Sequence, residues 1–354
     1  MKEQQPSLLK SNSQSPFTAT EIVLPGIVEP NGLLVNTRSL NNPNSDEVIL
    51  KMQATGVSFA EKSMRKDQYP GMPKFPFVPG YDLVGTVVAV GNDADKILIG
   101  KQFACLTLTG GWATYTTVKT ADLLPIPEGI NPVDAETLIV NGITAWQMLH
   151  RDAKVKKGNT ILVYGANGGV GTILTQLAQI SGVKVIGASS SRYHEILRND
   201  GVIPVDYTDE NLAQTILNIS PGGLDAVFDN IGGRSLDVSF GLLKKGGTMV
   251  SYALMSKTSS NTVRMMQFMY MVCKVLLLNI LPNGKNTAFY YIWSGKGTDK
   301  FRAKMKEDFA SLMNLLLQNK LKPKIAATFP LTEISKAMEF SESRTAYGKV
   351  VLVP

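Results

Sequence analysis

Cysteine and histidine are both scarce in this chain of 354 residues, which contains two of each. The cysteines are Cys105 and Cys273, and the histidines are His150 and His194. Two cysteines exclude a disulfide framework and a structural cysteine-rich zinc site, and so few histidines leave little for metal chemistry. The sequence therefore predicts a protein of a reducing compartment, which we take to be the cytoplasm.

Long apolar runs and targeting signals are also missing. The first 17 residues have neither the apolar core of a secretory signal nor the arginines of a mitochondrial presequence, so we predict a flexible polar leader over residues 1–20. The most apolar stretch, Met265–Leu281, is interrupted by Lys274 and is a poor membrane span. We expect it to form a buried helix that lines a pocket or a subunit contact. The alternative is an exposed, Met-rich flap that touches membranes.

The overall composition is that of a globular protein, with 44% hydrophobic and 18% charged residues. Its length predicts two domains. Lysine and arginine total 36 against 29 acidic residues, a formal net charge of +7. Because the basic residues are dispersed rather than arranged in a basic and aromatic stripe, we expect no nucleic-acid partner.

The period of the apolar residues changes near Pro132. From Glu21 to Pro127 the chain has short apolar runs broken by Gly and Pro, which predicts a barrel or sandwich of strands. Beyond Pro132, strand-like and helix-like stretches alternate, which is typical of a parallel sheet with helices on both faces. The last run, Gly348–Val353, again has strand character, so we expect the chain to return to its first domain. The fold class is therefore α/β.

The most informative segment is a glycine-rich loop between an apolar strand and an amphipathic helix. Glycines at such a junction allow a tight turn and close approach of the backbone to a pyrophosphate, which then meets the free N–H groups of the helix. The glycines are spaced one residue wider than the usual dinucleotide pattern. The predicted cofactor-binding residues of this loop are Gly165, Ala166, Gly168, Gly169, Val170 and Gly171.

The end of the next strand predicts which dinucleotide binds. A carboxylate there would bind a ribose hydroxyl, whereas small polar and basic residues accept the phosphate of NADP. The sequence has no acid at this point, and the hydroxyls of Ser189 and Ser190 and the guanidinium of Arg192 can bind that phosphate. NADPH is the predicted cofactor. These serines could instead cap the following helix, and both roles are compatible.

Five segments together resemble the medium-chain dehydrogenases/reductases, in particular the zinc-free quinone oxidoreductases and enoyl reductases. The resemblance implies a GroES-like β-rich catalytic domain, from residues 21–140 and 295–354, and a doubly wound Rossmann domain over residues 141–294 that binds NADP. It also favours a homodimer. The segments are Gly56–Gly91, Asn141–Leu149, Ile161–Gly171, Phe228–Gly233 and Tyr347–Leu352.

The same resemblance speaks against a catalytic zinc. Zinc-containing relatives carry a cysteine where this chain has Ser58 and a His-Glu pair where it has Tyr81 and Asp82. A hydroxyl and a phenol are poor zinc ligands, and the four-cysteine lobe of the zinc alcohol dehydrogenases is missing. We therefore predict no metal.

Without a metal, the substrate oxygen needs another electrophile. Tyr69 matches a family tyrosine that borders the nicotinamide, and its phenol could donate to a developing oxyanion. The alternative is that Tyr69 is a wall residue and that no side chain is essential. Ser58 replaces the usual asparagine, which weakens the transfer of a substrate class. Arg65 matches a basic family position. The alternative is that it is an ordinary surface cation with no special role.

Further positions follow from the family pattern and from the rule that ligands bind at the carboxyl ends of parallel strands. The additional cofactor-binding candidates are Thr144, Tyr207, Asn230 and Ala253, and Arg344 and Lys349 lie near the family's C-terminal cofactor contacts. The expected walls of the substrate pocket are Ser58, Phe59, Tyr81, Trp112 and Tyr291. An aromatic lining suits an apolar substrate.

We therefore expect an NADPH-dependent reductase that transfers hydride to a quinone or to the activated C=C of an α,β-unsaturated carbonyl compound. The alternative is a membrane-surface interaction protein that retains the reductase fold. The basic net charge and the apolar stretch motivate that alternative, and a vesicle-associated branch of the family makes it conceivable.

Overall fold

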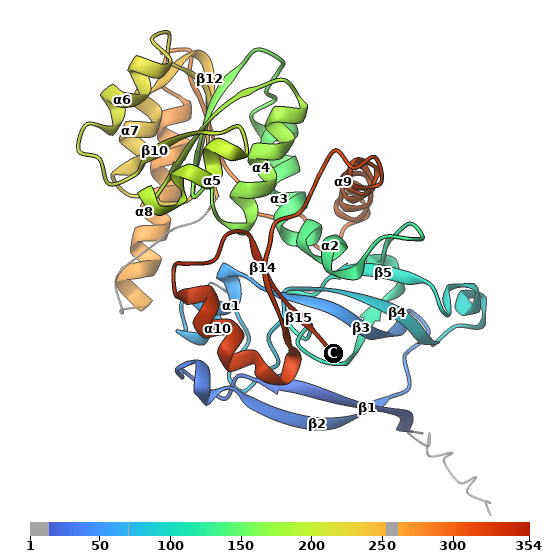
Figure 1. Ribbon diagram of the computed structural model, residues 1–354. Helices are drawn as coiled ribbons and strands as arrows, with labels where there is room; N and C mark the ends of the chain where they lie inside the picture. The colour runs from blue at the N-terminus through green and yellow to red at the C-terminus, as the bar shows by residue number, and fades with distance from the viewer. Residues whose placement is uncertain (1–13, 70, 253–260) are drawn as a thin grey trace, which may run out of the picture.

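The chain folds into two lobes, one built on a parallel sheet and one on mostly antiparallel strands (Figure 1). The structure is a computed structural model, and it describes residues 14–69, 71–252 and 261–354. The predicted α/β class, with a GroES-like and a Rossmann-like part, is confirmed. No helix within these ranges is both long and apolar enough to span a bilayer.

Six parallel strands form the sheet of the Rossmann lobe, in the order β10-β9-β8-β11-β12-β13. The central strands are apolar and buried, as expected when helices cover both faces of a parallel sheet. The order reverses between β8 and β11, and the crevice beyond that point is where such sheets bind ligands. The strands are β8 (Thr160–Tyr164), β9 (Lys184–Ser189), β10 (Ile203–Asp206), β11 (Leu224–Asp229), β12 (Leu243–Ser251) and β13 (Asn286–Phe289). Their helices are α4 (Gly169–Ile180), α5 (His194–Asn199), α6 (Leu212–Ile219), α7 (Ser235–Gly241) and α8 (Asn261–Asn279).

The other lobe contains a sheet of seven strands made from both ends of the chain. Its last strand pairs antiparallel with β3, so the chain returns to its first domain as expected. The strands are β3 (Glu47–Val57), β4 (Asp82–Val90), β5 (Gln102–Leu106), β6 (Tyr115–Lys119), β7 (Leu124–Pro125), β14 (Ile325–Pro330) and β15 (Lys349–Val353). The helices around this sheet and between the lobes are α1 (Phe59–Arg65), α2 (Pro132–Thr137), α3 (Ile143–Trp146), α9 (Asp299–Leu317) and α10 (Ile334–Glu342).

One apolar core extends through both lobes. It joins Met52 and Val84 of the antiparallel strands to Ile161 and Phe228 of the parallel sheet, and Leu312 of α9 packs into the same cluster. Because this core is continuous, the two lobes are held in a defined orientation, and residues far apart in sequence can form one site.

The leader is shorter than we predicted. Strand β1 (Gln14–Val23) already begins at Gln14 and pairs antiparallel with β2 (Leu34–Asn41). The prediction of a flexible leader is therefore wrong for residues 14–20, whose backbone polar groups are used in this two-stranded ladder.

The apolar stretch is also more exposed than we predicted. Helix α8 buries Met271 and Val275 against the Rossmann lobe. The prediction of a buried helix is wrong for much of its remaining surface, because tertiary packing covers a single stripe of this helix. The exposed large apolar side chains of this segment are Val263, Met265, Met266, Met269, Tyr270, Leu276, Leu277, Ile280 and Leu281.

Candidate functional site: the glycine loop and the aromatic pocket

The glycine loop joins β8 to α4, in the strand–turn–helix context that the sequence predicted. Gly165 has φ of +64°, and a Cβ there would lie 2.7 Å from Nδ2 of Asn230. At Gly171 a Cβ would lie 2.1 Å from the carbonyl oxygen of Gly165, which is backbone and cannot swing away. Both positions therefore require glycine, one for its conformation and one for the close helix-on-loop packing.

The amino end of α4 has the features of an anion site. Within the described chain, no side chain caps this helix at Gly168, so the first N–H groups of a 12-residue helix remain available. The buried Asn141 lies beside the same turn, since a Cβ on Gly169 would come within 2.4 Å of its Nδ2 atom. Among the described residues this Nδ2 has no hydrogen-bond partner. A donor left unpaired next to a helix amino end fits a pyrophosphate or ribose oxygen.

The lobes meet at this loop. The N–H of Gly348 donates to the carbonyl oxygen of Asn167 at 3.0 Å, which ties the C-terminal segment to the glycine turn. On the other side, the buried Asp229 accepts from the N–H of Ile231 at 2.8 Å and from the hydroxyl of Ser239 at 2.7 Å. These bonds hold the turn after β11 and thereby place Asn230 against Gly165. Asn230, one of the predicted cofactor-binding residues, therefore lies beside the glycine loop.

The residues predicted to bind the adenosine end lie together beyond β9 and β10. The N–H of Tyr207 donates to the carbonyl oxygen of Ser189 at 3.3 Å, and Arg192 is exposed beside them. The alternative of serine capping is wrong, because neither the turn after Ser190 nor α5 has a side-chain cap. Asp206 was not anticipated: its carboxylate accepts from the N–H and hydroxyl of Thr208, which lower its pKa.

Thr144 and Ala253 are two further cofactor-binding candidates. Thr144 is buried in α3, three residues after Asn141, whose side chain lies beside the glycine loop. Ala253 lies outside the described residues, so its role stays a prediction.

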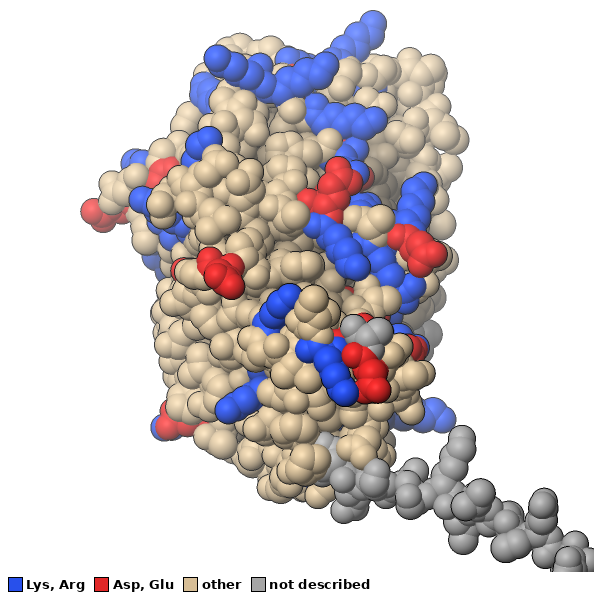
Figure 2. Space-filling model, turned by 90° about the vertical axis from the view of Figure 1, so that its right-hand side faces the viewer, with Lys and Arg blue, Asp and Glu red and all other residues tan. Residues whose placement is uncertain are grey.

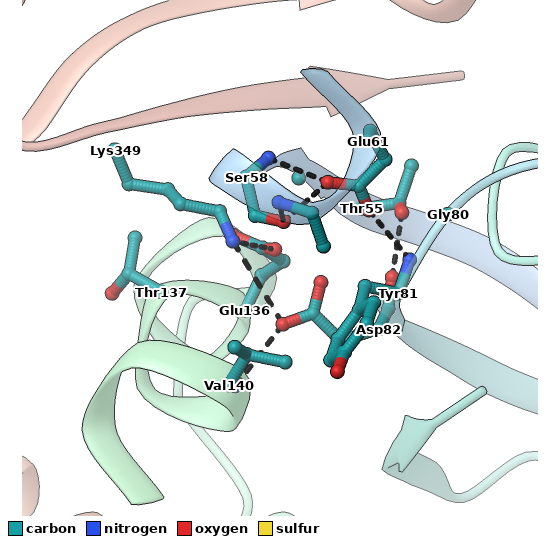
Figure 3. Close-up of polar contacts among 12 residues, drawn as sticks. Thr55, Ser58, Glu61, Gly80, Tyr81, Asp82, Glu136, Thr137, Val140 and Lys349 are labelled. Atoms are coloured by element: carbon teal, nitrogen blue, oxygen red, sulfur yellow. Dashed lines mark hydrogen bonds and ion pairs between the residues drawn. The ribbon is translucent and has the colours of Figure 1, made fainter. Parts of the chain in front are cut away.

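Ser58 and Glu61 form a capping box at the start of α1 (Figure 3). The N–H of Ser58 donates to Oε2 of Glu61 at 2.8 Å, and the N–H of Tyr81 donates to its Oε1 at 2.8 Å. The hydroxyl of Ser58 also contacts this carboxyl group. Burial raises the pKa of Glu61, while the nearby ammonium of Lys349 lowers it. The hydroxyl of Ser58, which stands where zinc-containing relatives have a cysteine, is therefore engaged in capping α1.

Asp82 is neutralised by a buried ammonium group (Figure 3). Nζ of Lys349 lies 3.8 Å from Oδ2 of Asp82 and 3.3 Å from Oε1 of Glu136. Burial raises the pKa of Glu136 well above its ordinary value, and burial alone would lower that of Lys349, but the two carboxyl groups raise it instead. Lys349 is thus neither a cofactor contact nor a solvated charge: it is the counter-ion of two carboxyl groups.

Tyr69 and Tyr81 lie edge to face, with ring centroids 5.9 Å apart and their hydroxyl groups in contact. Nε1 of Trp293 donates to the hydroxyl oxygen of Tyr81. Burial raises the pKa of Tyr69 to about 12, against a lowering by the hydrogen bond with Tyr81. At neutral pH Tyr69 therefore carries its proton and can donate it.

Of the five expected pocket walls, three are at least partly exposed and stay predictions, and two are buried and need correction. Phe59 and Tyr291 are about half exposed, and Ser58 is partly exposed nearby. Trp112 is 1% exposed and its Nε1 donates to the carbonyl oxygen of Gly56 at 2.9 Å, so it is a core residue and not a wall. Tyr81 is 3% exposed and stands behind Tyr69.

Arg65 is likewise not a surface cation. Its side chain is 1% exposed and forms two hydrogen bonds with Glu342, at 2.8 and 2.9 Å. Because one guanidinium nitrogen, Nη2, donates to both carboxylate oxygens, this ion pair joins α1 to α10 across the catalytic lobe. Arg65 therefore holds α1, the helix on which Glu61 also lies.

Comparison with known proteins agrees with the fold. Residues 44–128 match the alcohol dehydrogenase GroES-like domain, and residues 199–352 match a model described as zinc-binding dehydrogenase. A rat protein named synaptic vesicle membrane protein VAT-1 homolog is 30% identical over 317 residues, which cover 88% of this chain and 78% of the relative. The chain belongs to the quinone oxidoreductase-like group of the medium-chain dehydrogenases/reductases.

Other members of this group match over most of their length. A probable quinone oxidoreductase of Schizosaccharomyces pombe is 27% identical, covering 91% of this chain and 93% of the relative. Two crystal structures share the fold. Human VAT-1 homolog-like protein has a TM-score of 0.79 at 24% identity, covering 95% of this chain and 98% of the other. Escherichia coli quinone oxidoreductase, solved with NADPH, has a TM-score of 0.81 at 21% identity, covering 95% and 100%.

Sequence reasoning missed several residues of this site. The sequence did not predict that Trp293 donates a hydrogen bond to Tyr81, and neither Asn141 nor Asp229 was assigned a role. For Asp229, the run Asp-Asn-Ile-Gly-Gly after an apolar strand is a turn signal that could have pointed to it. For Trp293 no local signal exists, because its partner Tyr81 lies 212 positions away.

Proposed function

We propose that this protein is an NADPH-dependent oxidoreductase that transfers hydride to a quinone or to the activated C=C of an α,β-unsaturated carbonyl compound. Membership of the oxidoreductase family supports the reaction class. The observation that carries the proposal is the pair of phenols, Tyr69 and Tyr81, with Tyr81 at the position of a zinc-ligating histidine. A neutral phenol is a hydrogen-bond donor for an oxyanion, whereas it is a poor metal ligand.

The cofactor's residues are those of the glycine turn and the ends of β9 and β10. The open amino end of α4 and Nδ2 of Asn141 would bind pyrophosphate and ribose oxygens. Arg192 and the serines would bind the 2′-phosphate, which favours NADPH over NADH. When bound, the nicotinamide supplies the hydride.

The chain's own residues would orient the substrate and stabilise its developing charge. Tyr69 would donate its O–H to the carbonyl or quinone oxygen, which gains negative charge as the carbon framework is reduced. Tyr291, which is close enough to Tyr69 to affect its pKa, and Phe59 are exposed aromatic side chains that would contact an apolar substrate. Because the pKa of Tyr69 is about 12, this donor stays protonated through neutral pH.

Turnover with quinones and enones tests this function. We expect the purified protein to oxidise NADPH with a substrate from one of these classes, and Tyr69→Phe to lower turnover by more than tenfold. Tyr115→Phe is the matched control, because its phenol lies on β6 and packs on Phe17. A Tyr69→Phe variant with turnover within a factor of two of wild type would show that Tyr69 is not the donor.

Zinc independence is part of the proposal. Ser58 is used as a helix cap and Asp82 pairs with Lys349, so neither is available as an ordinary metal ligand. Dialysis against a chelator should leave turnover unchanged. Metal analysis that finds one zinc per chain, lost together with activity, would contradict this part.

A second candidate function rests on the exposed face of α8. We propose that this helix contacts a membrane surface while the fold is retained, because eight large apolar side chains between Met265 and Leu281 are exposed. The same helix packs on β13, the outermost strand of the sheet, so a second copy of the chain is the competing occupant. A homodimer remains our expectation from the family.

Vesicle flotation separates these outcomes. Leu276→Glu with Leu277→Glu should abolish co-flotation with anionic vesicles, while Leu217→Glu on α6 should not. Absence of wild-type binding, or dissociation of a dimer by the double variant in sedimentation, would favour the second copy instead.

The proposal includes no nucleic-acid partner. Basic side chains are interspersed with acidic ones over much of one face of the molecule, and broad uncharged surface separates them (Figure 2). A weak, salt-insensitive retention on single-stranded polynucleotide is the expected result. We also keep the cytoplasm as the proposed location.

A further inference from the structure

Three aromatic side chains, Trp293, Tyr81 and Tyr69, form one chain of hydrogen bonds between distant parts of the sequence. Nε1 of Trp293 donates to the hydroxyl oxygen of Tyr81, and the hydroxyl groups of Tyr81 and Tyr69 are in contact. Trp293 and Tyr81 are 5% and 3% exposed, whereas Tyr69 is partly exposed. The chain therefore ends at the one member that can reach a substrate.

The direction of these bonds follows from what each group can donate. An indole N–H is a donor only, so Tyr81 must accept from Trp293. If Tyr69 also donated to Tyr81, the hydroxyl hydrogen of Tyr81 would be buried without an acceptor, since the described residues offer its hydroxyl no other partner than these two. Leaving such a buried donor without an acceptor is unfavourable, because its bond to water is lost and not replaced. The order Trp293 to Tyr81 to Tyr69 gives both buried donors an acceptor.

In this order the O–H of Tyr69 remains free to donate outward. Consecutive donors polarise one another, so each bond strengthens the next. The hydrogen bond from Tyr81 also stabilises negative charge on the Tyr69 oxygen and lowers the pKa of that phenol, opposing the effect of burial.

Two members of the chain, Tyr81 and Trp293, are held by further contacts. The N–H of Tyr81 is held by Glu61 at 2.8 Å, and its ring lies 5.3 Å from the ring of Trp293 in an edge-to-face contact. Trp293 stacks on Phe301 with centroids 6.3 Å apart, and Nζ of Lys296 lies 4.7 Å from its ring. These contacts fix the donors before a substrate arrives, which is the condition for electrostatic stabilisation of an oxyanion.

We propose that Tyr81 and Trp293 are positioning residues for Tyr69, which turn its hydroxyl hydrogen toward the substrate oxygen and support the charge left on its phenol. This inference rests on the proposed reductase function.

The balance of protons and electrons requires one proton donor, which is Tyr69. Hydride from NADPH adds to the β-carbon of an enone, NADPH becomes NADP⁺, and the C=C electron pair moves to form an enolate. The enolate takes one proton from the O–H of Tyr69, and water returns a proton to the tyrosinate. Tyr81 and Trp293 give up no proton, because each acts only by donating a hydrogen bond.

Tyr81→Phe and Trp293→Phe test this arrangement, because each removes a donor and keeps an aromatic ring. We expect Tyr81→Phe to lower turnover about tenfold with little change in KM, and Trp293→Phe to lower it less. The limb of the pH profile that reports deprotonation of Tyr69 should move to higher pH in Tyr81→Phe, since a bond that lowers this pKa is lost. Tyr115→Phe and Trp146→Phe are the matched controls.

The double variant Tyr69→Phe/Tyr81→Phe separates positioning from general damage. If Tyr81 acts through Tyr69, the double variant is no slower than Tyr69→Phe alone. Additive losses, or a pH limb that does not move, would overturn the proposal.

Binding of 4-nitrophenol to the NADP⁺-loaded protein tests the same idea without turnover. This phenolate mimics the enolate oxygen, and we expect Tyr81→Phe to weaken its binding about fivefold. Equal affinity in wild type and Tyr81→Phe would overturn the inference. If wild type reduces no quinone or enone, the proposed function fails, and the phenolate measurement still decides the role of Tyr81.

Discussion

The glycine turn and the aromatic pocket show two ways of building a polar site. The turn after β8 offers backbone N–H groups and needs glycines where a Cβ would clash, as at Gly171. The pocket instead depends on side chains, Tyr69, Tyr81 and Trp293, that come from distant parts of the chain. A site made of backbone groups can therefore be recognised in a short stretch of sequence. A site made of side chains from distant parts of the chain can be recognised only in the folded structure.

Asp82 follows Tyr81 of the side-chain site directly, and removing its buried counter-ion, Lys349, should have the largest effect on stability. Lys349→Met keeps the length of the side chain but leaves Asp82 and Glu136 without their ammonium group. Breaking a buried ion pair by removing one partner costs about 3–5 kcal/mol. Denaturant unfolding should show this loss, and Lys336→Met on the exposed face of α10 should cost less than about 0.5 kcal/mol. A small loss for Lys349→Met would mean that the carboxyl groups are neutral without it.

Adding a methyl group to the glycine turn should have the second-largest effect. Gly171→Ala places a Cβ 2.1 Å from the carbonyl oxygen of Gly165, so the turn must move. Overpacking of this kind costs about 1–3 kcal/mol, and the displaced N–H groups should weaken NADPH binding more than tenfold. Gly241→Ala in α7 is the control, because its Cβ would meet open space. NADPH affinity unchanged in Gly171→Ala would place the pyrophosphate elsewhere.

The effect of Arg192 should be smaller and selective. Arg192→Ala should raise the KM for NADPH about tenfold and leave the KM for NADH nearly unchanged, because only NADPH carries the extra phosphate. Arg198→Ala, an exposed change on the adjacent α5, should alter neither. Equal effects on both cofactors would show that Arg192 does not bind the 2′-phosphate.

The smallest expected effect is at Glu136. Burial raises the pKa of this carboxyl group above its ordinary value of 4.5, so it binds a proton more tightly in the folded protein. The stability that it contributes is full below pH 4.5 and is lost as the pH rises through the raised pKa. Glu136→Gln removes this pH dependence, so the difference in stability between the variant and wild type should shift in favour of the variant as the pH rises through that interval. A difference that shrinks as the pH rises would have the wrong sign.

The same contrast explains what could be predicted from the sequence. The strand–glycine–helix pattern at Gly165–Gly171 is local, so the Rossmann fold and the loop residues were predictable. Trp112 and Arg65 were misplaced because local sequence does not show what packs over a residue. For α8, an apolar sequence indicates that a helix has faces to bury, but only the tertiary structure shows that a single stripe is covered.

Binding of NADPH and NADH to the purified protein, titrated separately by fluorescence, tests the central claim most directly. The account predicts that NADPH binds and that it binds at least tenfold more tightly than NADH. Binding of neither dinucleotide would contradict the claim that the turn at Gly165–Gly171 is a cofactor site, and would leave the exposed face of α8 as the better guide to function.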